Sequence, residues 1–299
     1  MMNKKVLTYG MHLQGISHKK EEIPCQDFHQ YKELNNGWVI AAIADGVGSA
    51  KHSEFGSKLA VETTIEYLEA NLESETDINS VIEKLAIAYQ QSYETIVKFS
   101  EQNQHDVRDY DTTLSVAVYD GTKVAYGHVG DGGIIGLGTN GQYEFIARPM
   151  KGPDGITVIP LRFGIESWNF GVYDEVTSII LVTDGLLDGL FAPKLFKLIE
   201  KELYVIELRK FLDKNFNGIT RDNIEEFEKV VESIFGEGGV YYDITEDDKT
   251  IVVLTSLVNT SQIMEDEYYS EPDWTAIRKA KDEIIYAKHK MCMKETSDE

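Results

Sequence analysis

Aspartates at the ends of short apolar runs are the residues of this sequence whose type and spacing could do chemistry. Asp45, Asp131 and Asp184 close the runs WVIAAIADG, KVAYGHVGD and SIILVTDG, and Asp247 and Asp248 come just before KTIVVLTSL. Strands of β-branched and aliphatic residues hold each carboxylate in a defined position. Like charges that gather in one place need compensation, and divalent cations with oxygen ligands supply it. The pattern predicts a metal-dependent hydrolase.

Short turns join the apolar runs into hairpins. Residues 28–44, 114–129 and 134–147 each contain two apolar runs separated by an Asn-Gly or Asp-Gly turn. These dipeptides favour tight hairpins, so the strands are expected to run antiparallel. This counts against a doubly wound nucleotide-binding fold, whose parallel strands need helical crossovers.

Helical periodicity separates and follows the hairpins. Apolar residues recur at three-to-four spacing, which gives each helix an apolar face to lay on a sheet. The predicted fold class is therefore α+β, with two packed, mainly antiparallel β-sheets flanked by helices in an α-β-β-α sandwich. The expected helices are residues 54–72, 78–99, 195–203, 205–214 and 223–235.

Composition limits the partners and the compartment. The chain has 51 Asp and Glu against 29 Lys and Arg, with a net charge of −22. Nucleic-acid affinity comes largely from clustered basic residues, so a protein or small phosphoester partner fits better. Cys25 and Cys292 lack the spacing of a zinc site or disulfide framework, which suits a reducing compartment. No segment approaches the ~20 apolar residues that span a bilayer, so we expect a cytoplasmic protein without membrane association.

Two segments stand apart from these elements. Residues 150–173 are rich in Gly and Pro without clear periodicity, which predicts a flap or irregular loop near the site. After Leu257 the chain becomes polar and acidic, and residues 275–291 then have a helical pattern. We expect a catalytic domain at 1–257 and an acidic C-terminal extension with a helix at 258–299, whose last residues should fray.

The order of the motifs resembles that of a known family. The series CQD, ADGVGS, DTTLSVAVY, GHVGDGG, VTDGLLDGL and EDDKTIVVL is similar to that of the metal-dependent, type 2C (PPM-type) serine/threonine protein phosphatases, in their bacterial form. The likeness covers residues 8–257. One Asp-Gly after a strand is common at turns, whereas the full series in order is specific. It implies a signalling hydrolase that acts on phosphoserine and phosphothreonine proteins, with a cognate kinase as a further partner.

The resemblance also implies roles for individual residues. Asp45 would bridge two metal ions and Gly46 would offer its carbonyl. Asp184 and Asp247 would complete the catalytic set, and the motif spacing selects Asp247 rather than Asp248.

Two further acids and the ions themselves follow from the same resemblance. Asp131 and Asp188 are associated with a third, weaker metal site. Hard oxygen ligands favour Mg²⁺ or Mn²⁺ over zinc. Two such ions about 4 Å apart can lower the pKa of a bridging water and present hydroxide in line with phosphorus, so that no protein nucleophile is required.

Some positions depart from the family pattern. Gln26 stands where a Glu usually helps to hold the second ion, so that site is expected to be weaker or to depend on Asp27 through water. His18 replaces the usual Arg that clamps the substrate phosphate, although it could equally be a solvent-facing histidine. Val47 stands where eukaryotic relatives often have a general-acid His, so the leaving group must take its proton from solvent or metal-bound water.

Two other functions are compatible with the sequence. One is a catalytically weak or silent scaffold of the same fold that binds a signalling partner. The complete acid set favours the enzyme, while Gln26 leaves the scaffold open. The other is hydrolysis of a small-molecule phosphoester, because a two-metal site does not itself recognise a peptide.

Overall fold

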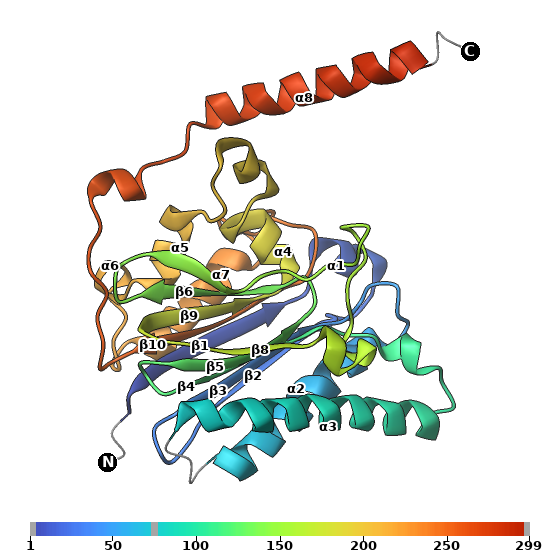
Figure 1. Ribbon diagram of the computed structural model, residues 1–299, viewed down its shortest axis with the longest axis vertical. Coiled ribbons are helices and arrows are strands. Elements are labelled where there is room, and N and C mark those ends of the chain that lie inside the picture. Colours follow the sequence, from blue (N-terminus) through green and yellow to red (C-terminus); the bar gives the residue numbers. More distant parts are fainter. Residues whose placement is uncertain (1–3, 73–76, 296–299) are drawn as a thin grey trace.

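The computed structural model describes residues 4–72 and 77–295 and contains two five-stranded sheets (Figure 1). Every strand pairing within the two sheets is antiparallel. The first sheet has the order β1 (Val6–Leu13), β10 (Lys249–Ser256), β9 (Val176–Val182), β6 (Gly133–Gly138) and β7 (Tyr143–Ala147). The second has the order β2 (Asp27–Glu33), β3 (Val39–Asp45), β4 (Leu114–Tyr119), β5 (Val124–Val129) and β8 (Asn169–Tyr173).

Helices cover the outer face of each sheet, so the molecule has four layers (Figure 1). The long helices α2 (Ser53–Leu72) and α3 (Val81–Gln102) pack on the second sheet, and α5 (Val205–Leu212) and α7 (Ile224–Phe235) pack on the first. The predicted α-β-β-α sandwich is thereby confirmed. The shorter elements are α1 (Ile16–Glu21), α4 (Asp184–Leu186), α6 (Lys214–Asn217), and the turns η1 (Ile78–Ser80), η2 (Val107–Tyr110), η3 (Leu161–Phe163), η4 (Ile165–Ser167) and η5 (Leu187–Phe191).

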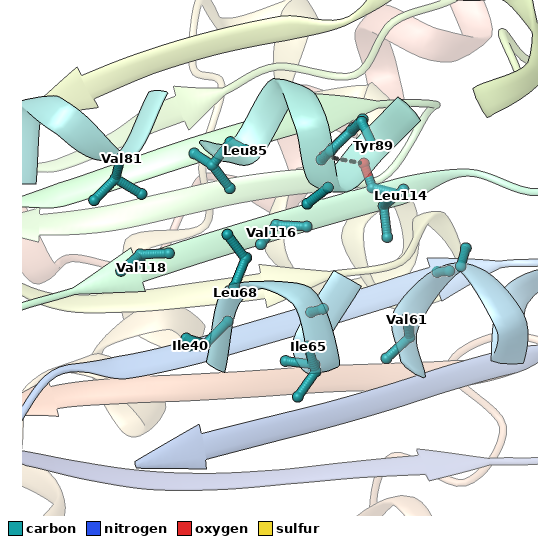
Figure 2. Packing of buried hydrophobic residues seen from close by; sticks show 14 of the residues in the cluster. Ile40, Val61, Ile65, Leu68, Val81, Leu85, Tyr89, Leu114, Val116 and Val118 are labelled. Atoms are coloured by element: carbon teal, nitrogen blue, oxygen red, sulfur yellow. Dashed lines mark hydrogen bonds between the residues drawn. The ribbon is translucent and has the colours of Figure 1, made fainter. Parts of the chain in front are cut away.

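Three apolar clusters hold these layers together. One fills the space between the two sheets, and one lies under α5 and α7. The third, shown in Figure 2, places Leu68 of α2 and Leu85 of α3 against Ile40 and Val116 of the second sheet. Burying each such side chain stabilises the fold by about 1.5–3 kcal/mol. These contacts hold the helices on both sheets and the two sheets on each other.

The structure confirms the three hairpins and corrects two expectations. Residues 195–203 do not form a full helix: η6 (Lys194–Ile199) is a 3₁₀ helix, and Glu200 then takes a left-handed conformation with φ 57° that ends it. The flap is not irregular throughout, because residues 169–173 form β8, which pairs with β5. Phe170 packs on the core between the second sheet and α3, and this contact explains the strand.

The segment after β10 lies against the first sheet and its helices. Tyr143 donates its backbone N–H to the Tyr268 hydroxyl at 3.0 Å, and the Arg209 guanidinium lies 3.8 Å from the Tyr269 ring centroid. Trp274 packs against Phe196 at the start of α8. The segment includes η7 (Asp266–Tyr269), and α8 (Trp274–Glu295) then extends beyond the body in Figure 1. Within the described ranges, no helix is both long and apolar enough to cross a membrane.

Candidate metal centre

The predicted acids converge at one end of the sandwich. Asp45, Asp131 and Asp184 each offer a carboxylate oxygen, and these oxygens lie within 4.8 Å of one another. Together with Asp247 they line a cleft of about 130 Å³. The other residues that line it are His18, Gln26, Gly46, Val47, Gly48, Thr113 and Val158.

Backbone hydrogen bonds fix Asp45 at the end of β3. Its N–H donates to the Thr113 hydroxyl at 2.9 Å, and its carbonyl accepts from the Thr112 hydroxyl at 3.0 Å and from the Thr113 N–H at 2.8 Å. Gly46 packs so closely on α2 that an added Cβ would lie 2.7 Å from the Ser53 Cβ. The threonine pair therefore braces the strand end.

The turn between β5 and β6 presents Asp131. Gly130 precedes it with φ +116°, and a Cβ at this position would lie 2.4 Å from the Thr113 Cβ. Only glycine adopts this conformation in this space without strain. The Asp131 side chain is almost completely buried, and the Lys151 ammonium lies 3.3 Å from its Oδ2.

Burial and mutual repulsion raise the pKa values of the clustered acids. Burial, followed by the charge of Asp131, raises the pKa of Asp184 to about 6. Burial, followed by the charge of Asp27, raises the pKa of Asp45 well above its usual value. Asp247 lies at the exposed mouth of the cleft, and desolvation by the surrounding protein still raises its pKa. Such a set of oxygen donors fits hard divalent cations, which would compensate the repulsion.

Asp248 has a different role from Asp247. Its carboxylate accepts hydrogen bonds from the backbone N–H groups of Gly15 and Gln26, both at 2.6 Å. Its Oδ1 also lies 2.9 Å from Nδ1 of His18, whose ring lines the cleft. Asp248 thus orients His18. Sequence analysis missed this role, because the contact joins residues 230 positions apart.

Asp27 is opposite Asp45 in the pairing of β2 with β3, but it is not among the residues that line the cleft. Its Oδ2 accepts hydrogen bonds from the hydroxyls of Thr183 at 2.9 Å and Thr250 at 2.6 Å. Burial, followed by the charge of Asp248, raises its pKa well above the usual value. Asp27 therefore lies next to the cleft, held by two threonine hydroxyls beside Asp45.

Asp188 lies one helical turn beyond Asp184 and is also absent from the lining of the cleft. Its Oδ2 is 2.5 Å from the Lys194 ammonium. The hydrogen bond from Lys194 to Asp188 raises the pKa of the lysine, and the charges of Asp184 and Asp131 act in the same direction. No feature of the sequence had indicated this partner.

The chain matches the model of the protein phosphatase 2C family over residues 14–219. A comparison with curated proteins found no match. Among solved structures, the serine/threonine phosphatase of S. agalactiae has a TM-score of 0.58 at 14% identity, covering 84% of this chain and 99% of that one.

Two further solved structures have the same fold. Serine/threonine phosphatase Stp1 from Staphylococcus aureus has a TM-score of 0.55 at 15% identity, covering 85% of this chain and 95% of its own. The catalytic domain of the serine threonine protein phosphatase PstP, in complex with 2 manganese ions, has 0.55 at 16%, covering 84% and 98%. At these identities the likeness establishes a shared fold.

Proposed function

The chain belongs to the protein phosphatase 2C family and is a metal-dependent serine/threonine phosphatase, and we propose that the acidic cleft is its catalytic centre. The observation that carries this proposal is the convergence of Asp45, Asp131 and Asp184 within 4.8 Å, with Asp247 in the same cleft. Separate strand ends supply these acids, and among the described residues that line the cleft the other polar side chains are those of His18, Gln26 and Thr113.

The cleft would hold two ions, Mg²⁺ or Mn²⁺. Asp45 and Gly46 line it at the end of β3, and Asp184 and Asp247 line it just after β9 and just before β10. The ions would supply an activated water at neutral pH and neutralise the phosphoryl group that is attacked. Gln26 would bind the second ion more weakly than a carboxylate. Asp27 would act indirectly. The Thr183 hydroxyl holds its carboxylate, and Asp27 lies opposite Asp45 in the pairing of β2 with β3.

His18 is the residue that we propose to hold the substrate phosphate. Because Nδ1 faces Asp248, the other ring nitrogen remains for the substrate. Val47 offers no proton, so the leaving alkoxide would take its proton from solvent. We further propose that the catalytic domain spans 1–257 with 258–299 as its extension, that the enzyme works in the cytoplasm, and that a cognate kinase generates its substrates.

Hydrolysis of a phosphothreonine peptide and of an aryl phosphate tests this proposal, with Mn²⁺, Mg²⁺ or chelator. Turnover should require metal and fall by at least roughly 100-fold in Asp184→Asn. Replacing a residue that only hydrogen-bonds to a metal ligand already lowers metal affinity or activity by up to that factor. Asp174→Asn is the matched control, since Asp174 is exposed and pairs with Lys123 away from the cleft. Turnover that survives chelation would refute the mechanism. Metal binding without turnover would instead support the scaffold.

A further inference from the structure

Each of the two acids associated with a third metal ion faces a lysine of this chain. Lys151 lies 3.3 Å from Asp131, and Lys194 lies 2.5 Å from Asp188. The two lysines come from different segments, the base of the flap and the start of η6. A third divalent ion would have to share these carboxylates with two ammonium groups.

The backbone holds Lys151 beside the turn that presents Asp131. Met150 donates its N–H to the Gly130 carbonyl at 2.7 Å, and Lys151 forms a β-bridge with Val158, which lines the cleft. The Asp131 side chain is only 4% exposed. Water therefore screens this ion pair much less than a surface pair.

The support of Lys194 comes from a different segment, the start of η6. η6 follows Pro193, and its Phe196 is buried against Tyr204 and Trp274. The pair with Asp188 is more open, because the Lys194 side chain is 69% exposed. The short distance to Asp188 nevertheless places a second positive charge next to the cleft.

We propose that Lys151 and Lys194 take the place of the third ion, so that the protein binds two divalent cations and not three. Two ammonium groups carry the same total charge as one divalent ion, and they neutralise Asp131 and Asp188 without a free cation. A third ion would meet repulsion from both lysines at close range. The inference rests on the proposed function for the two-ion site. It adds that two lysines of the chain supply the positive charge that a third ion would otherwise supply.

Counting bound manganese tests the inference without measuring activity. The metal-free protein is titrated with Mn²⁺, and free Mn²⁺ is followed by electron paramagnetic resonance. The unmodified protein should bind two ions, and the double variant Lys151→Gln/Lys194→Gln should bind three. Lys151→Arg/Lys194→Arg keeps the charge and should bind two. Lys123→Gln, which breaks a comparable ion pair with Asp174 away from the cleft, should also bind two.

The outcomes separate this inference from the proposed function. Three ions in the unmodified protein would overturn it, and this count does not depend on any variant folding. Two ions in the double glutamine variant, with its thermal transition intact, would also overturn it. Both results leave the two-ion catalytic centre standing. No bound manganese in the unmodified protein would overturn the proposed function together with the inference.

Discussion

Replacing Asp184 by asparagine should stabilise the metal-free protein at neutral pH, although it removes an acid that we assign to catalysis. The structure buries Asp184 beside Asp131, and burial is the main cause that raises its pKa to about 6. An asparagine of nearly the same shape carries no charge to desolvate. The substitution therefore removes the free-energy cost of burying a charged carboxylate, which only bound metal would otherwise compensate.

The magnitude follows from linkage between protonation and folding. A carboxyl whose pKa is raised in the folded state contributes stability below its unfolded pKa and loses it as pH rises through the folded pKa. For Asp184 this loss runs from about pH 4 to about pH 6 and amounts to about 3 kcal/mol. The asparagine variant should be more stable than the unmodified protein by up to that amount above about pH 7, and by nothing near pH 4.

Urea denaturation in the presence of chelator measures this difference. The two proteins are compared at about pH 7.5 and about pH 4, with Asp174→Asn as the control for loss of an exposed carboxylate. Saturating Mn²⁺ should reverse the order at the higher pH, because only the unmodified protein then gains the full binding free energy. An asparagine variant that is less stable in chelator at about pH 7.5, or equally stabilised at both pH values, would show that the buried charge of Asp184 does not destabilise the metal-free protein.

Three other predictions concern His18, Gly130 and Trp274. His18→Gln should raise KM for a phosphothreonine peptide by roughly 10-fold, as expected for a lost charged hydrogen bond, and an unchanged KM would remove His18 from phosphate binding. Gly130→Ala should lower the free energy of unfolding by about 1–3 kcal/mol, since its φ is +116° and its Cβ would overlap Thr113; urea denaturation with no loss would contradict this. Trp274→Ala should lower the thermal transition by removing the contact with Phe196, and an unchanged transition would argue that the tail does not stabilise the body.

The gathering of acids in one cleft can be predicted from the sequence because these acids follow directly from strand ends. Asp45, Asp131 and Asp184 each close a strongly apolar run, which places each of them at the end of a predicted strand. Turn chemistry and the apolar character of a run are local properties of the sequence. They can therefore be read without knowledge of the tertiary structure.

The partners of these acids could not be predicted in the same way. Asp248 and Gln26 are 222 positions apart, and their contact depends on how the two sheets pack. Lys151 and Lys194 resemble ordinary surface lysines in the sequence, and only the path of the flap and of η6 brings them to the cleft. Tertiary packing also determines the strand at 169–173, because Phe170 of this Gly-rich segment packs against the core.

The position of manganese in crystals of the protein, located by its anomalous scattering, tests directly whether the acidic cleft holds two metal ions. We expect two peaks in the cleft between Asp45, Asp184 and Asp247, with no third peak between Asp131 and Asp188. Manganese bound elsewhere, or an empty cleft in a protein that hydrolyses phosphothreonine peptides under the same conditions, would contradict it.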